Sequence, residues 1–158
     1  MLKPRKIPTR EQMLQQMAGL CAKCEQCEHD LREKMRKKGL PGADADAVID
    51  FLYDHNFLNE SRFAHAYASD KHRFNGWGRI KIRMMLGMKR VSRDCIDDAL
   101  AALDEKEYME ILQTLVNAKA RDLDLSDAKD RAKLLRSLYG RGFEPALIVK
   151  AMRRSGED

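Results

Sequence analysis

Residues 86–91 read LGMKRV, and the same pattern ends two other basic amphipathic stretches of this 158-residue chain. Residues 35–40 read MRKKGL and residues 138–143 read LYGRGF. Each copy has an apolar residue, two spacers, a basic residue, Gly or Arg, and a second apolar residue. The final residues of the copies, Leu40, Val91 and Phe143, lie 51 and 52 positions apart. Self-similarity at such a period is typical of tandem structural repeats, so we expect three related units.

The apolar residues that follow each copy have helical spacing. They lie five and nine positions after the second and third copies, at Ile96 and Leu100 and at Ile148 and Met152. The equivalent pair after the first copy is Val48 and Leu52, displaced by three residues inserted around Pro41. A separation of four places two side chains on one helix face, one turn apart. No segment alternates with a period of two, so the sequence predicts an all-α fold.

Helix boundaries can be predicted from capping chemistry. Thr9 with Gln12 fits a capping box, and an oxygen side chain opens further helices at Asn59, Ser92, Ser126 and either Asp44 or Asp46. Gly39 and Gly142 suit the left-handed turn that closes a helix. We therefore expect a basic tail over 1–8 and three-helix units over 9–55, 59–103 and 105–154.

The predicted helices are short, and their length affects how the units pack together and what kind of partner they bind. Helices of this length are marginal alone, so neighbouring units should stack, share apolar faces and form an elongated, curved body. Such a body binds along a surface, which favours a large partner over a small molecule in a pocket.

Positive charge is concentrated in the middle third of the chain. The whole chain carries 30 Lys and Arg against 25 Asp and Glu. Residues 71–93 hold eight basic side chains and no acidic one: Lys71, Arg73, Arg79, Lys81, Arg83, Lys89, Arg90 and Arg93. Like charges at this density repel one another unless a partner compensates them. We expect an acidic protein surface or DNA phosphates to bind here, with a solvated helix face as the alternative.

Several function classes lack support in the sequence. No glycine-rich phosphate loop and no nucleophile paired with a base is evident, so we expect no enzyme activity and no cofactor. No stretch approaches the roughly 18 apolar residues that span a membrane, and no apolar signal core follows the basic N-terminus. The sequence predicts a cytoplasmic protein with no membrane partner.

The most distinctive stretch reads FLNESRFAHAY at residues 57–67, followed by DK at 70–71, WG at 77–78, KI at 81–82 and KRV at 89–91. This pattern resembles the RecX family, regulators of the RecA recombinase, and the likeness extends from about Glu11 to Met152. The resemblance implies three tandem three-helix repeats that lodge in the groove of the RecA filament on DNA. It also implies restraint of ATP hydrolysis, strand exchange and co-protease activity, with a place in DNA recombination, DNA repair and the SOS response. The chain departs from the family pattern at Arg90, where Gly is common, and in a cysteine cluster that many members lack.

The candidate contact residues for the partner or for DNA are Arg62, Lys71, Arg73, Trp77, Arg79, Lys81, Arg83, Lys89 and Arg90. On a helix that begins near Trp77, Arg79 and Arg83 share one face, and an apolar stripe of Ile80, Met84 and Met88 lies opposite. This makes Arg79 and Arg83 the strongest contact candidates. Trp77 either stacks on a base or a partner, or covers the start of its helix. Arg62 either contacts the partner or forms a structural hydrogen bond to a helix end at a repeat junction.

Cys21, Cys24 and Cys27 suggest a zinc site, since thiolates are preferred ligands of structural zinc. In a continuous helix, the first and third would lie about 9 Å apart along the axis, a poor fit to one ion. A break near Cys24 would reopen the possibility, with His29 or another residue as a fourth ligand. We therefore favour reduced cysteines that pack a corner, and no metal.

The leading hypothesis is a non-enzymatic modulator, mainly an inhibitor, of RecA filaments. DNA would be contacted within the filament or weakly alone. The alternative is a direct DNA-binding protein that competes for single-stranded or duplex DNA.

Overall fold

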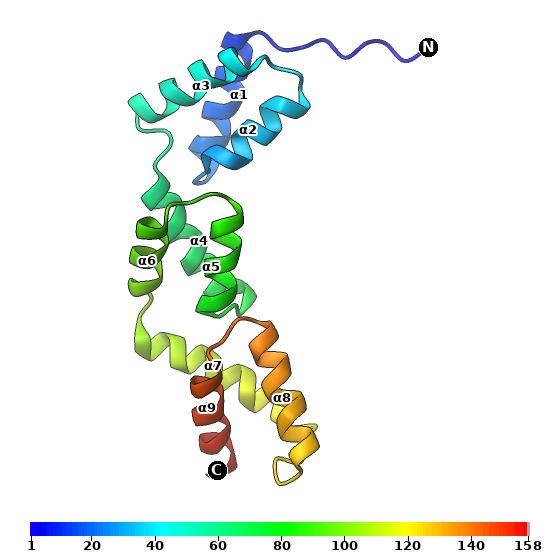
Figure 1. The fold of residues 1–158 in the computed structure, drawn as a ribbon, viewed down its shortest axis with the longest axis vertical. Coiled ribbons are helices and arrows are strands. Elements are labelled where there is room, and N and C mark those ends of the chain that lie inside the picture. The colour runs from blue at the N-terminus through cyan, green and yellow to red at the C-terminus, as the bar shows by residue number, and fades with distance from the viewer. Residues whose placement is uncertain (158) are drawn as a thin grey trace.

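The computed structural model describes residues 1–157, which form nine α-helices and no strand in that range (Figure 1). The helices are α1 (Arg10–Lys23), α2 (Glu28–Lys37), α3 (Gly42–Asp54), α4 (Glu60–Asn75), α5 (Arg79–Met88), α6 (Arg93–Ala101), α7 (Glu105–Ala120), α8 (Ala128–Gly140) and α9 (Pro145–Glu157). Residues 1–9 precede α1 without regular structure. The predicted all-α fold is confirmed.

The helices pack in three successive triplets. Contacts join α1 and α2 to α3, α4 to α5 and α6, and α7 to α8 and α9. The triplets follow one another along the long axis, with the two chain ends at opposite extremes (Figure 1). We call them unit one, unit two and unit three, after the predicted ranges 9–55, 59–103 and 105–154.

Side-chain caps open three of the helices at the expected residues. The capping box of Thr9 and Gln12 is present, and side chains accept a backbone N–H at Asn59 and Ser92. The predicted cap at Ser126 is wrong, because Asp127 caps α8 by accepting the N–H of Lys129 at 3.1 Å. Ser126 instead donates its N–H and hydroxyl to Asp124 in the preceding loop.

The start of α3 also differs from the prediction, which placed a cap at Asp44 or Asp46. The helix begins at Gly42 directly after Pro41, which provides no side-chain cap. Asp44 lies in the first turn, where a carboxylate is favourable near the positive end of the helix dipole. Asp46 lies farther along the helix and pairs with Arg32 of α2 at 2.7 Å. Both aspartates are therefore helical residues.

The second helix of each unit ends in a left-handed turn. Gly39 and Gly142 have φ values of +83° and +94°, as predicted for helix-closing glycines. Arg90 occupies the equivalent position in unit two at φ +59°. A left-handed conformation costs a non-glycine residue about 1 kcal/mol, so unit two keeps this turn without the glycine.

Each unit has its own apolar core. Unit one is centred on Met13, Leu31 and Leu52, unit two on Ala64, Ile82 and Leu86, and unit three on Tyr108, Leu112 and Phe143. The expected sharing of apolar faces is confined to a few residues. Cys27 of unit one enters the core of unit two, and Leu103 packs against the cores of units two and three. Polar and aromatic side chains of the helices also join the units, as where His72 of α4 stacks on Tyr108 of α7.

Candidate partner-binding surface

Half of the basic side chains between residues 71 and 93 are neutralised by acids from elsewhere in the chain. The ion pairs are Arg73–Glu107 at 2.6 Å, Arg79–Glu105 at 2.5 Å, Arg79–Glu144 at 2.8 Å, Arg83–Asp97 at 2.6 Å and Lys89–Asp30 at 2.7 Å. The premise that all eight cations are uncompensated is therefore wrong. Within residues 1–157, no ion pair involves Lys71, Lys81, Arg90 or Arg93.

Arg79 is built into the junction between units two and three. Its side chain is only 19% exposed, and its guanidinium lies 3.8 Å from the ring centroid of Tyr108. The Arg79 N–H donates to the Tyr108 hydroxyl at 3.1 Å, and that hydroxyl donates to Glu144. Burial raises the pKa of Tyr108, so the hydroxyl stays protonated. Arg79 therefore holds two units together and does not project freely toward a partner.

The same junction depends on two glycines that allow the backbones to touch. Gly78 donates its N–H to the Arg141 carbonyl at 2.8 Å, and Ile80 donates to the Gly142 carbonyl at 2.9 Å. A Cβ on Gly78 would overlap the Gly142 carbonyl and lie 2.5 Å from the nitrogen of Phe143. Sequence reasoning identified Gly142 only as a helix stop, and nothing in the sequence links it to Gly78.

His72 is a buried residue of this junction, and no sequence pattern singles it out. It is 2% exposed, its ring stacks on Tyr108 at 4.7 Å, and it meets the ring of Phe143 edge-on at 6.3 Å. The Trp77 carbonyl lies 2.8 Å from Nδ1 and can only accept, so Nδ1 carries the proton. Burial lowers the pKa of His72, because the charged form would lose its hydration. Only tertiary structure brings these three rings together.

Three lysines of unit two, two of them without an ion pair, gather on a pair of aromatic rings. The ammonium of Lys81 lies 4.4 Å from the Trp77 ring centroid and that of Lys71 lies 5.0 Å from it. The ring of Tyr67 meets Trp77 edge-on at 6.4 Å, with Lys71 5.5 Å and Lys89 6.0 Å from the Tyr67 centroid. We call these five residues the lysine–aromatic cluster. Cation–π contacts hold its positive charges at defined places on the surface.

Trp77 and Arg62 both make structural contacts. Trp77 is half-buried against the core of unit two, which agrees with the covering role. Arg62 donates to Glu25 and to the Asn56 side chain, each at 2.9 Å, and so ties unit two to unit one.

The apolar stripe on α5 exists but faces outward. Ile80, Met84 and Met88 are 42%, 57% and 66% exposed. Ile82 and Leu86, on another face of the same helix, are fully buried and supply the core contact. The outer surface of α5 is therefore apolar and lies beside cations.

Comparison with known proteins places this architecture in a family. The model for "RecX, second three-helix domain" matches residues 59–100, and that for "RecX, third three-helix domain" matches residues 105–152. The regulatory protein RecX of Vibrio campbellii is 32% identical over 131 residues, which cover 83% of each chain. The chain belongs to the RecX family. The regulatory protein RecX of Pseudomonas fluorescens is 31% identical over 139 residues, covering 88% of each chain.

Solved RecX structures share the fold. The crystal structure of RecX from Lactobacillus salivarius superposes with a TM-score of 0.80 at 17% identity, covering 94% of this chain and 97% of that one. A second RecX crystal structure gives a TM-score of 0.77 at 17% identity, covering 92% and 71%. The RecX repeat architecture is therefore established for this chain. Among the helices of residues 1–157, none has the length and apolar character needed to cross a membrane.

Three of the four cysteines, Cys21, Cys24 and Cys27, lie around the break between α1 and α2. The chain has the break near Cys24 that the sequence left open, because α1 ends at Lys23, Cys24 is its C-cap and Cys27 precedes α2. Cys27 is buried, and burial raises its pKa to about 11. Cys21 is half-buried and Cys24 is exposed. Within residues 1–157, no three His, Cys, Asp or Glu side chains are placed to hold a metal.

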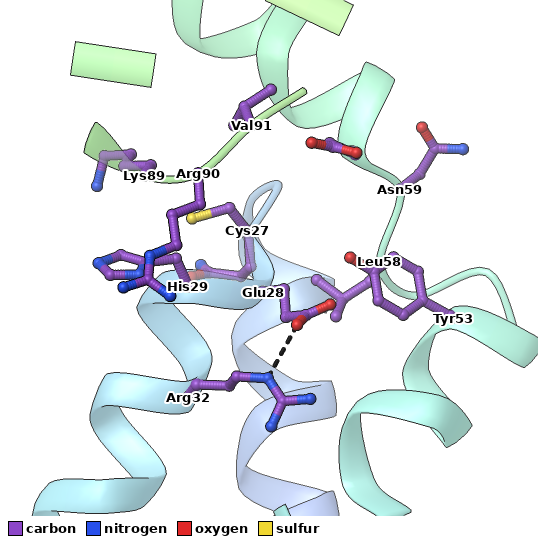
Figure 2. Close-up of a pocket in the computed structure, with 12 residues that line it drawn as sticks. Cys27, Glu28, His29, Arg32, Tyr53, Leu58, Asn59, Lys89, Arg90 and Val91 are labelled. Carbon is purple, nitrogen blue, oxygen red and sulfur yellow. Dashed lines mark hydrogen bonds and ion pairs between the residues drawn. The ribbon is translucent and has the colours of Figure 1, made fainter. Parts of the chain in front are cut away.

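A polar cavity of about 350 Å³ separates units one and two of the RecX fold (Figure 2). Lys89 and Arg90 line it from the turn after α5, and Glu28 and Arg32 line it from α2, where they pair at 2.9 Å. Units two and three are in direct backbone contact at the equivalent place. The first junction is thus looser than the second, although both are built from the same repeat positions.

Proposed function

We propose that this chain binds RecA filaments on DNA and restrains their ATP hydrolysis, strand exchange and co-protease activity. The proposal places it in the cytoplasm, in DNA recombination and repair and the SOS response. It is supported by the membership of the RecX family, whose relatives are regulatory proteins. The contact surface that we propose is the lysine–aromatic cluster of unit two with Arg90 beside it.

One observation carries the choice of surface: two lysines of unit two that form no ion pair are held against one aromatic ring. Lys71 and Lys81 sit on Trp77, and Arg90 is exposed on the turn after α5. A filament of protein on nucleic acid presents carboxylates and phosphates, which such cations can neutralise with release of counterions. Because no internal acid must be displaced first, binding through these residues carries no cost of breaking an ion pair.

The paired cations differ in how easily they can join this surface. Arg73 and Arg83 have half-exposed side chains, and their surface ion pairs contribute little to stability. Either can exchange its carboxylate for one on the partner. Lys89 is more buried and is held by Asp30, while Arg79 cannot leave Glu144 without disturbing the junction. We therefore assign Arg79 a positioning role in this surface.

The test is a filament pull-down with purified RecA, single-stranded DNA and a slowly hydrolysed ATP analogue. We expect Lys71→Glu/Lys81→Glu to weaken filament binding at least about tenfold and to lose inhibition of DNA-dependent ATP hydrolysis. The matched control is Lys129→Glu/Lys133→Glu, which makes the same change in net charge on exposed residues of α8. Equal binding by the two double variants would refute the assigned surface.

The second candidate function is direct DNA binding, favoured by an aromatic ring that lies beside two unpaired lysines. A salt titration separates the two functions. Tight binding to naked DNA at physiological salt, with a steep salt dependence and no preference for filaments, would support the second function and contradict the first.

A further inference from the structure

An apolar groove of about 520 Å³ lies between α8 and α9 of unit three. Its apolar lining includes Leu125, Leu135, Val149 and Met152, and its charged lining residues are Arg131 and Arg153. Leu135 and Met152 are half-buried and Val149 is exposed. The groove is therefore an open apolar surface with cations as its only charged groups.

The repeat shows that this groove is not a requirement of the three-helix unit. In unit two, Arg83 of α5 pairs with Asp97 of α6 at 2.6 Å, so the second and third helices are bridged by an ion pair. In unit one, Arg32 stands at the position equivalent to Arg83 and pairs with Asp46 of α3 at 2.7 Å. Asp46 and Asp97 are each the fifth residue of their helix, so the three-residue displacement predicted for the third helix of unit one is wrong. The second and third helices of each unit can therefore be compared at the position of this ion pair.

In unit three the same bridge is replaced by apolar side chains. The offset of 52 residues that aligns Val91 with Phe143 places Leu135 at the position of Arg83 and Val149 at that of Asp97. Two units thus cover this place with a polar pair, and the third leaves it apolar and open. Since two units fold with the ion pair at this place, folding alone does not explain why apolar residues replace it in unit three.

The charges beside the groove indicate what it binds. Neither Arg131 nor Arg153 forms an ion pair within residues 1–157, and no acidic side chain lines the groove. Arg131 donates to the carbonyls of Leu125 and Ser126 through Nη1 alone. A guanidinium binds a carboxylate through two parallel hydrogen bonds, so the complementary ligand combines apolar side chains with carboxylates.

We propose that the α8–α9 groove is a docking site for an acidic amphipathic segment of a protein partner. The apolar side chains of that segment fill the space between Leu135 and Val149, and its carboxylates pair with Arg131 and Arg153. This site goes beyond the proposed function, which uses unit two, and it does not depend on that function.

The test uses a fluorescein-labelled peptide of about 14 residues, composed of Leu and Glu with helical spacing. Its binding to the full chain is followed by fluorescence anisotropy. Leu135→Arg/Val149→Asp introduces the ion pair of unit two into unit three, so it closes the groove with a pair that the fold already accommodates. We expect this variant to bind the peptide at least about tenfold more weakly than the natural chain. Circular dichroism and thermal melting establish that it is folded.

Two further measurements sharpen the test. Arg153→Glu should weaken peptide binding several-fold, and a peptide with Lys in place of Glu should bind poorly, because both changes oppose like charges. Lys71→Glu/Lys81→Glu should leave peptide binding unchanged, which separates this site from the lysine–aromatic cluster.

Three outcomes would overturn the proposal. They are no binding of the acidic peptide by the natural chain up to about 1 mM, equal affinity in the groove variant, and equal affinity for the basic peptide. Sedimentation supplies a fourth. If the natural chain dimerises and Leu135→Arg/Val149→Asp makes it monomeric, the occupant is a second copy and not an acidic segment. Failure of the filament experiment has no bearing on these titrations, so the two proposals fail separately.

Discussion

Replacing Gly78 by Ala should loosen the junction between units two and three. The new Cβ would lie 2.5 Å from the nitrogen of Phe143 and overlap the Gly142 carbonyl, and both are backbone atoms that no side-chain rotation can move aside. The two segments would have to separate by about 1 Å, which breaks the bonds from Gly78 to Arg141 and from Ile80 to Gly142. Overpacking costs about 1–3 kcal/mol and each lost hydrogen bond about 1 kcal/mol. We therefore expect a loss of about 3–5 kcal/mol.

Urea denaturation followed by circular dichroism measures this loss. Gly78 has φ −85°, a conformation that alanine adopts without strain, so the effect reports the contact alone. Gly87→Ala on α5 is the control, because nothing lies within 4 Å of its new Cβ. It should stabilise the chain by about 0.5–1 kcal/mol through helix propensity. A Gly78→Ala protein as stable as the natural chain would refute the close-contact account of the junction.

Three other predictions concern single side chains. Arg79→Ala should lower the free energy of unfolding by about 2–3 kcal/mol, while Arg83→Ala, which breaks an exposed ion pair, should cost less than about 1 kcal/mol; equal losses in chemical denaturation would contradict the structural role of Arg79. The pKa of His72 is lowered in the folded chain, so the unfolded chain binds more protons between that pKa and about 6.5. The free energy of unfolding should therefore decrease as the pH is lowered through this window. Replacing His72 by Phe should flatten that part of the pH profile, and an unchanged slope would refute the assignment. At neutral pH, iodoacetamide should label exposed Cys24 and leave Cys27 unmodified, since burial raises the pKa of Cys27 to about 11; mass spectrometry showing both modified at similar rates would contradict its burial.

Local chemistry made much of the fold predictable from the sequence. Thr9, Asn59 and Ser92 cap helices because a short oxygen side chain beside free N–H groups has few better partners. Ser126 was mispredicted because two aspartates flank it closely, one taking its hydrogen bonds and the other taking the cap. Such a competition between neighbours is decided by loop geometry, which the sequence does not specify.

The contact surface was less predictable, because the charges that are neighbours in the sequence are not the charges that are neighbours in the folded chain. The sequence showed eight cations without an acid in residues 71–93, but the chain brings Asp30, Glu105, Glu107 and Glu144 to them from units one and three. By sequence spacing, Arg79 and Arg83 are equivalent residues on one helical face. Their partners come from different units, so one is a junction residue and the other is a surface residue. Only tertiary structure separates them.

Hydrogen exchange of the chain bound to RecA filaments, compared with the free chain, tests the central claim most directly. If unit two contacts the filament, amides between residues 67 and 93 should exchange more slowly in the complex, with unit one unchanged. Unchanged exchange in that segment, or slowing confined to unit one, would contradict the account.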